Sequence, residues 1–325
     1  MLKILRILFF VVLSVPAFFV YASETACPRP LAQPAPAVVQ EAMRKAQDHG
    51  FLWRISRDGR TSFLYGTIHV AKFDWMFPGT QVMKAILATD TLALELDIMD
   101  PDIQSRLATG MAALPRTALP VSLNKRMRQQ AEQVCVPYAS IAQSAPEMQI
   151  TTLTIMAGRR DGLEAAYAID AVLAGIGHSS SKVMVSLETP EQQLQLLKMQ
   201  NQQETISFVE DSLLELESGR SLKMIRRIAK VWSDSDYNEM ERFSEWCECL
   251  KTESERAWMK RALDDRNPAL AENIDALHTS GKQVFAAVGS LHMFGQAGLP
   301  KLLEQRGYRV ERVSLRQEAP SLKPN

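Results

Sequence analysis

The sequence predicts an α/β fold with a mostly parallel central sheet, an N-terminal β-hairpin and extensive helical segments that cover the sheet. Three observations support this. Short runs of β-branched and aliphatic residues alternate with segments of helical periodicity, which is typical of a parallel sheet. Two β-rich segments flank Asp58-Gly59, a dipeptide that favours a tight hairpin turn. The composition is that of an ordinary globular domain, with 46% hydrophobic and 23% charged residues among 325.

The first 22 residues have the features of a secretory signal peptide. Two basic residues precede an apolar run, and Ala22 offers a small residue at the cleavage point. The apolar run over residues 7–22 is short for a membrane span. We therefore expect a periplasmic or secreted protein with no stable membrane span after cleavage. A protein anchored to the membrane through an uncleaved N-terminal segment is the alternative.

The rest of the chain divides into three segments. Residues 23–37 are proline-rich and are expected to form an extended leader. Residues 38–318 are expected to form the α/β domain with its helical lid segments, and residues 319–325 a flexible tail. The formal net charge of zero argues against a nucleic-acid partner.

The four cysteines form an even set, which in an exported protein predicts two disulfides. Cys247 and Cys249 flank a single residue, which is too close for an unstrained bridge. We therefore expect Cys27 and Cys135 each to pair with one of these two, with the choice of partner left open. A thiolate metal site is the alternative, but no C-x-x-C pair supports it.

Four strands are expected after the hairpin, over residues 91–96, 182–188, 283–288 and 308–313. The second of these leads directly into a helix start, because Thr189 and Pro190 supply a hydroxyl cap and a first-turn proline. A helix that ends at Gly307 precedes the last strand. The tracts over 101–178 and 190–279 have helical periodicity, and they are expected to cover the sheet or form a lid.

Polar residues end four of the expected strands. His69 and His292 each close a G-x-x-H motif after an apolar run, and Glu95 and Glu188 lie at the ends of two other strands. The carboxyl ends of parallel strands gather at one sheet edge, where ligands bind. A single G-x-x-H motif is a weak signal, but two copies beside two carboxylates are a stronger one. Two imidazoles and two carboxylates form a ligand set that divalent cations accept.

The residues around these motifs add a fifth candidate, Arg266. Asn267 is expected to cap a helix with Pro268 in its first turn, which leaves Arg266 at a junction between two helices. A guanidinium there could pair with a site carboxylate or stabilise an oxyanion, and a surface arginine over a helix break is the alternative.

Gly66 and Gly289 begin the two G-x-x-H motifs. They are expected to have positive φ and to let the backbone pass close to a bound ion or substrate.

The remaining histidines lie in polar helical or loop contexts and are expected to face solvent: His49, His178 and His278. Four tryptophans are expected to pack in the core or the lid: Trp53, Trp75, Trp246 and Trp258. Neither group adds a further candidate to the predicted site.

Five segments between Phe51 and Val313 resemble the TraB/GumN family of the TIKI-like superfamily: LYGTIHV, LALELD, VSLETPEQQLQLL, DDRNPALAENI and VFAAVGSLHMFGQAGLPKLLEQRGYRV. The resemblance implies an α/β fold related to the erythromycin-esterase and ChaN proteins. It also implies a divalent-metal-dependent hydrolase, of which a metallopeptidase is one kind, because animal members are described as metal-dependent proteases. The family's functional positions fall on His69, Glu95, Glu188, Arg266 and His292.

The leading interpretation is an exported hydrolase that binds Zn, Mn or Co and acts on a peptide or small-molecule substrate. His69 and His292 would hold the ion with Glu95 or Glu188, and the other glutamate would act as general base. Arg266 would face the negative charge on the attacked carbonyl oxygen. One alternative is a non-catalytic periplasmic binding or assembly protein for a metal, haem or an exopolysaccharide-related ligand. Another is a metal-free esterase with a histidine base.

Overall fold

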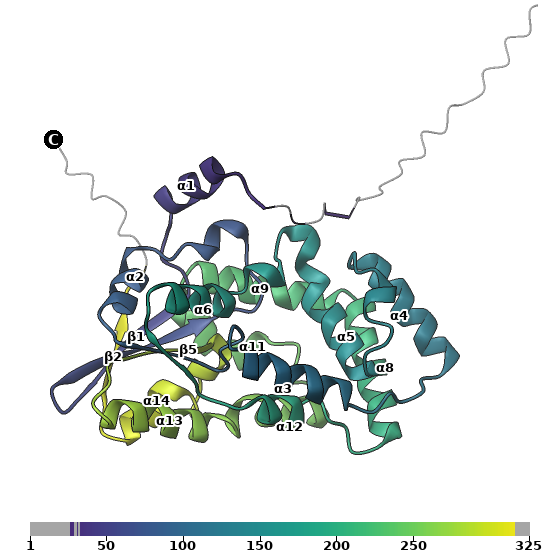
Figure 1. The fold of residues 1–325 in the computed structure, drawn as a ribbon. Coiled ribbons are helices and arrows are strands. Elements are labelled where there is room, and N and C mark those ends of the chain that lie inside the picture. Colours follow the sequence, from purple (N-terminus) through teal and green to yellow (C-terminus); the bar gives the residue numbers. More distant parts are fainter. Residues whose placement is uncertain (1–26, 29–30, 32, 316–325) are drawn as a thin grey trace, which may run out of the picture.

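The computed structural model describes residues 27–28, 31 and 33–315, and it confirms the expected fold class. One six-stranded mixed sheet has the strand order β4-β3-β5-β2-β1-β6 (Figure 1). The strands are β1 Phe51–Arg57, β2 Arg60–Thr67, β3 Thr91–Leu94, β4 Val183–Ser186, β5 Val284–Gly289 and β6 Arg309–Val313. Neighbours among β4, β3, β5 and β2 pair in parallel, whereas β1 is antiparallel to both β2 and β6.

The hairpin forms where its turn signal predicts it. Arg57 pairs with Arg60 across a two-residue loop, and both loop residues have positive φ, 52° at Asp58 and 73° at Gly59. Two positive φ values give a turn whose twist matches that of the strands. Phe51 and Leu64 of the two arms are fully buried, so the hairpin contributes to the core as well as to the sheet.

Helices cover both faces of the sheet. Figure 1 shows α6 and α9 on one face and α13 and α14 on the other. The helices are α1 Pro36–Arg44, α2 Thr80–Leu87, α3 Pro101–Ala112, α4 Val121–Gln133, α5 Pro146–Ile155, α6 Ile169–Ser179, α7 Pro190–Gln195, α8 Gln202–Glu217, α9 Arg220–Ser233, α10 Tyr237–Glu241, α11 Phe243–Trp246, α12 Glu253–Met259, α13 Asn267–Thr279 and α14 Leu299–Gln305. The predicted start of α7 is confirmed, because Thr189 and Gln192 form a complete capping box.

Helices α4, α5 and α8 have a hydrophobic core of their own, to one side of the sheet (Figure 1). Leu123 and Met127 of α4 pack in it with Ile150 of α5 and Leu213 of α8. Each of these four side chains is at least 96% buried. We call this part of the molecule the helical unit, and it accounts for much of the long helical tracts expected from the sequence.

The ends of the chain lie largely outside the described residues. These include the predicted signal peptide over 1–22 and the predicted tail over 319–325. Helix α1 begins at Pro36, so the last two residues of the expected leader are helical. Among the residues described, no helix has the length and apolar character needed to cross a membrane.

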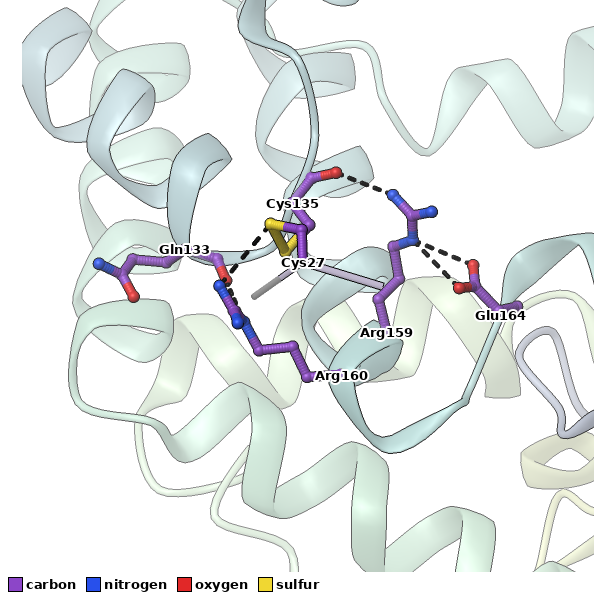
Figure 2. The surroundings of a disulfide bond; sticks show 6 residues. All are labelled: Cys27, Gln133, Cys135, Arg159, Arg160 and Glu164. Carbon is purple, nitrogen blue, oxygen red and sulfur yellow. Dashed lines mark hydrogen bonds and ion pairs between the residues drawn. A yellow bond between two sulfur atoms is a disulfide. The ribbon is translucent and has the colours of Figure 1, made fainter. Parts of the chain in front are cut away.

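The expected disulfide pairing is wrong. Cys27 is bonded to Cys135, and Cys247 to Cys249, with Cα–Cα distances of 5.5 Å and 5.1 Å. Cys135 follows α4 with a φ of 62°, so the chain turns there toward the leader. Cys247 and Cys249 lie in the turn after α11, which brings their Cα atoms within the range that a disulfide spans. Figure 2 shows that Arg159 donates to the carbonyl oxygen of Cys135, at 2.8 Å.

The expectation for the other histidines holds for only one of them. His178 is exposed and pairs with Asp97 at 2.8 Å. His49 is half-buried. His278 is fully buried, and its two ring nitrogens bond to the Ser62 hydroxyl at 2.9 Å and to the carbonyl oxygen of Arg57 at 3.1 Å. The expectation that His278 faces solvent is therefore wrong, because its ring ties α13 to the hairpin.

Candidate functional site

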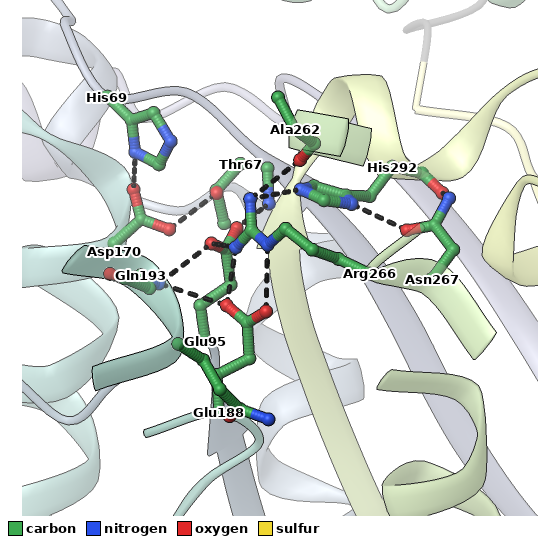
Figure 3. Close-up of polar contacts among 12 residues, drawn as sticks. Thr67, His69, Glu95, Asp170, Glu188, Gln193, Ala262, Arg266, Asn267 and His292 are labelled. Atoms are coloured by element: carbon green, nitrogen blue, oxygen red, sulfur yellow. Dashed lines mark hydrogen bonds and ion pairs between the residues drawn. The ribbon is translucent and has the colours of Figure 1, made fainter. Parts of the chain in front are cut away.

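The polar residues predicted at the strand ends come together at the carboxyl edge of the four parallel strands (Figure 3). Glu95 directly follows β3, and Glu188 lies two residues beyond β4. His69 lies two residues beyond β2, and His292 lies in a short 3-10 turn after β5. Because β4, β3, β5 and β2 are consecutive neighbours in the sheet, each strand delivers one side chain to the same edge.

The two glutamates share one arginine. Arg266 forms a bidentate pair with Glu188, in which Nε lies 2.8 Å from Oε1 and Nη2 contacts Oε2. Its Nη2 also donates to Glu95 Oε2 at 2.8 Å. The Gln193 amide donates to both carboxylates, at 3.2 Å and 3.1 Å. The three charged side chains are only 6–17% exposed, so their charges depend on one another for compensation.

Arg266 lies at the helix junction predicted for it. A π-helical turn over Lys260–Asp264 ends just before it and α13 begins just after it. Its Nη1 donates to the carbonyl oxygen of Ala262 at 2.9 Å. Asn267 does not cap the helix as expected: the cap position is Arg266, and Asn267 is the first helical residue. The Asn267 side chain forms a hydrogen bond with His292 instead.

Asn267 fixes the orientation and tautomer of His292. The Asn267 amide nitrogen donates to the carbonyl oxygen of Ala297 at 2.8 Å, so its Oδ1 faces the ring and accepts from His292 Nδ1 at 2.6 Å. The remaining nitrogen, Nε2, presents its lone pair to Arg266 Nη1 at 3.2 Å. Burial, reinforced by Arg266 and opposed by the neighbouring glutamates, lowers the pKa of His292 to about 4. The ring is therefore neutral at pH 7.

His69 is paired with Asp170 at the exposed rim of the site. Its Nδ1 donates to Asp170 Oδ2 at 2.8 Å, and the Thr67 hydroxyl donates to Oδ1 of the same carboxylate at 2.6 Å. The attraction of Asp170 raises the pKa of His69 to about 9. The side chain is 67% exposed, so solvent screens part of that attraction. Nδ1 is engaged, so Nε2 is the nitrogen free for a ligand.

Gly289 lies at the point where three of these side chains meet. A Cβ atom there would lie 3.3 Å from Glu95 Oε1, 3.5 Å from His69 Nε2 and 3.7 Å from His292 Cδ2. The expected positive φ is wrong, because Gly289 has a φ of −49°, and Gly66 is not among the residues with positive φ. Residue 289 must nevertheless be a glycine, because any side chain at this position would enter the site.

Glu95 is held as a carboxylate by these neighbours. Gly289 N donates to its Oε1 at 2.8 Å. Burial alone raises the pKa of Glu95, but its interactions with His292, which is protonated only at acid pH, and with His69 and Arg266, together with this hydrogen bond, lower it to about 2. Glu95 is thus ionised at any physiological pH, and its Oε1 faces the two imidazoles.

The chemistry of these donors fits a divalent cation, although their present spacing does not. No group of three histidine, cysteine or acidic residues in the described part of the chain is arranged to hold a metal as it stands. Both imidazoles have Nδ1 bonded to a side-chain oxygen, as metal-binding histidines usually do. Both glutamates are bonded to Arg266, so a cation would compete with the guanidinium for Glu95.

Three residues of this network were missed by sequence reasoning or were given another role: Asp170, Gln193 and Asn267. Asp170 lies in the first turn of α6, where an acidic residue is ordinary, and it is 101 residues from its partner His69. Gln193 lies just after the helix start predicted at Thr189 and was not singled out from the sequence. The one available signal was an Arg-Asn pair at a helix junction, which placed Asn267 near the site without revealing its bond to His292.

Comparison with known proteins gives a family and two relatives. The sequence model of the TraB/PrgY/gumN family matches residues 51–312. The chain is 24% identical over 251 residues to the uncharacterized protein YbaP of Shigella flexneri, which covers 75% of this chain and 88% of that protein. It is also 24% identical over 247 residues to YbaP of Escherichia coli strain K12, covering 74% and 86% of the two chains. No solved structure matches.

Proposed function

The chain belongs to the TraB/PrgY/gumN family, and from that premise we propose that it is a hydrolase whose site binds one divalent cation through His69, His292 and Glu95. The observation that carries the proposal is the arrangement over Gly289. His69 Nε2 and Glu95 Oε1 both lie within 3.5 Å of one point there, and His292 presents its ring edge at 3.7 Å. Nitrogen and carboxylate oxygen are the donors that Zn, Mn and Co accept.

The two histidines are prepared differently for this role. His292 is already neutral, and only its weak contact with Arg266 Nη1, at 3.2 Å, must be given up. His69 must lose a proton before Nε2 can bind a cation, because Asp170 raises its pKa. In return, the Asp170 carboxylate orients the ring and makes its nitrogen a stronger donor.

The two glutamates are assigned different roles. Glu95 Oε1 faces the histidines and takes the position of the third ligand. Both oxygens of Glu188 bond to Arg266, so Glu188 is assigned to positioning that guanidinium. The bound cation would act as a Lewis acid and activate water. Arg266, held in place and always charged, would donate to the oxygen on which negative charge develops.

The metal content of the purified protein tests this proposal directly. After dialysis against Zn, Mn or Co, we expect about one ion per wild-type chain. His69→Ala and His292→Ala should lose it, while His178→Ala, which removes an exposed and acid-paired histidine from another place, should retain it. Glu95→Gln should lose metal and Glu188→Gln should keep it. A wild-type protein that binds none of these ions, or two histidine variants with full metal content, would overturn the proposal.

A second candidate is a metal-free esterase, favoured by the His69–Asp170 pair. An exposed histidine whose Nδ1 donates to a carboxylate has the geometry of a general base with its orienting partner. In that case p-nitrophenyl ester hydrolysis would persist in EDTA and be lost in His69→Ala. Loss of the same activity in EDTA, with recovery on adding Zn, Mn or Co, would favour the metal-dependent reading instead.

We also propose that the protein is exported and acts on a peptide or small-molecule substrate. The support is the signal-like N-terminus and the Cys27–Cys135 disulfide, because structural disulfides persist in oxidising compartments. Mass spectrometry of the mature protein should find an N-terminus at residue 23. A chain that retains Met1 in the membrane fraction would contradict cleavage.

A further inference from the structure

A groove lies in the helical unit, and none of the residues that line it belongs to the candidate site. It has a volume of about 640 Å³ and lies between the start of α4, the start of α5 and the loop that precedes α4. This is within the size range of sites that bind small ligands or short peptide segments. Its lining includes three basic side chains and no acidic one. The basic residues are Arg116, Lys125 and Arg128.

These three positive charges are not neutralised within the described part of the chain. Arg116, Lys125 and Arg128 are exposed and form no ion pair with a described carboxylate. The contrast is Arg126 on the same helix, which pairs with Glu217 at 2.8 Å and with Glu210 at 3.8 Å. Glu210 and Glu217 of α8 thus pair with Arg126 and not with the groove residues, and the groove keeps a net positive charge.

The groove has a defined wall. Val121, Asn124, Lys125 and Arg128 recur at helical spacing on one face of α4, beside the buried face that contains Met127. This face presents charge to the groove while the helix is held by its own core. The exposed residues therefore do not depend on ligand binding for their position.

Aromatic and amide groups complete the wall. The guanidinium of Arg128 lies over the Tyr138 ring, 4.8 Å from its centroid. The Tyr138 hydroxyl donates to Gln149 Oε1 at 3.0 Å, and the Gln149 amide donates to the carbonyl oxygen of Ser144 at 2.9 Å. These contacts fix Arg128 in a defined orientation, which lowers the entropic cost of binding an anion.

We propose that this groove binds an acidic peptide segment. The positive charges select carboxylates, and Arg116 and Arg128 can bind them in bidentate fashion. Leu119 and Val121, the latter 87% exposed, offer aliphatic contacts for side chains between the acidic residues. A saccharide is less well matched, because Arg128 already covers a face of Tyr138, the groove's single aromatic ring. The proposal does not depend on hydrolase activity.

Fluorescence anisotropy with a labelled peptide of alternating glutamate and leucine tests the proposal on the full mature chain. We expect saturable binding that weakens when NaCl is raised from about 50 mM to about 300 mM. Lys125→Gln combined with Arg128→Gln should weaken it by about ten-fold or more. Lys84→Gln, which removes one exposed charge from α2, outside the groove, should leave it unchanged.

Further variants and probes separate the outcomes. Arg116→Gln combined with Lys125→Gln keeps the stack of Arg128 on Tyr138, so it must show a similar loss while the melting temperature stays at the wild-type value. The same peptide with glutamine in place of glutamate should not bind. Absence of binding, equal binding by the charge variants, or selective binding of polygalacturonate in place of the peptide would each overturn the proposal.

Discussion

Replacing Arg266 with methionine should destabilise the protein strongly, in a manner that depends on pH. Arg266 is the only cation bonded to Glu188 among the described residues, and it also bonds to Glu95. The two carboxylates are 6% and 11% exposed and share the amide of Gln193. Methionine fills the space of the side-chain stem but leaves two buried negative charges close together.

The size of the effect follows from this burial. Removing one partner of a buried ion pair costs about 3–5 kcal/mol, which corresponds to a fall in melting temperature of about 5–8 °C for a chain of this size. In the wild type, the pKa of Glu95 is lowered to about 2, so its contribution is present above the unfolded value of 4.5 and is lost as pH falls toward 2. In the variant, Arg266 no longer opposes the effect of burial, so the pKa of Glu95 rises above its wild-type value.

The pH dependence is therefore different in the two proteins. As pH falls, Glu95 takes up a proton more readily in the folded variant than in the folded wild type, so the difference in stability between the two proteins shrinks from pH 7 to about pH 5. Differential scanning calorimetry at both pH values measures this. Arg226→Met is the matched control, because Arg226 forms an exposed bidentate pair with Asp161 and should cost less than about 1 kcal/mol. The reasoning would be refuted if the loss of stability in Arg266→Met equalled that in Arg226→Met, or if it did not change with pH.

Three further predictions concern the site and the leader. Gly289→Ala should abolish metal binding while costing about 1–3 kcal/mol, because its Cβ would lie 3.3 Å from Glu95 Oε1; full metal content in a folded variant would contradict it. Asp170→Asn should bring the pKa of His69 down toward 6.5, as followed by NMR, and an unchanged titration would show that another group raises it. Cys27→Ser should lower stability by about 2–5 kcal/mol, because the bridge closes a loop of 108 residues. Equal melting temperatures for this variant and the wild type would contradict the last prediction.

Much of the fold could be predicted because its signals are local. The hairpin turn at Asp58 and the capping box at Thr189 are each specified by a few adjacent residues, and both form as expected. The disulfide pairing and the burial of His278 could not be predicted in this way. They depend on where α11 turns and on how α13 packs against the hairpin, which spacing along the sequence does not reveal.

The candidate site divides in the same way. Residues at strand ends were found because parallel strands deliver their carboxyl ends to one sheet edge, whatever the order of the strands. Asp170 was missed because it reaches the site from a helix N-terminus, 101 residues from His69. The bond from Asn267 to His292 was missed because asparagine before a proline is also a good helix cap. Both are residues that hold a functional side chain in place, and such partners have no characteristic sequence pattern.

The charge balance of the site supports the proposed cation. Three carboxylates surround it, and they are opposed by Arg266 and, without a ligand, by protonated His69. His292 is neutral, so the network carries one net negative charge at pH 7. A divalent cation that displaces the proton of His69 adds one positive charge overall, which brings the network to neutrality. A monovalent cation in the same position would leave the network with one net negative charge, because the positive charge that it adds is offset by the loss of the His69 proton. The arrangement therefore favours divalent over monovalent cations, and it predicts that metal binding releases a proton and strengthens as pH rises toward the pKa of His69, about 9.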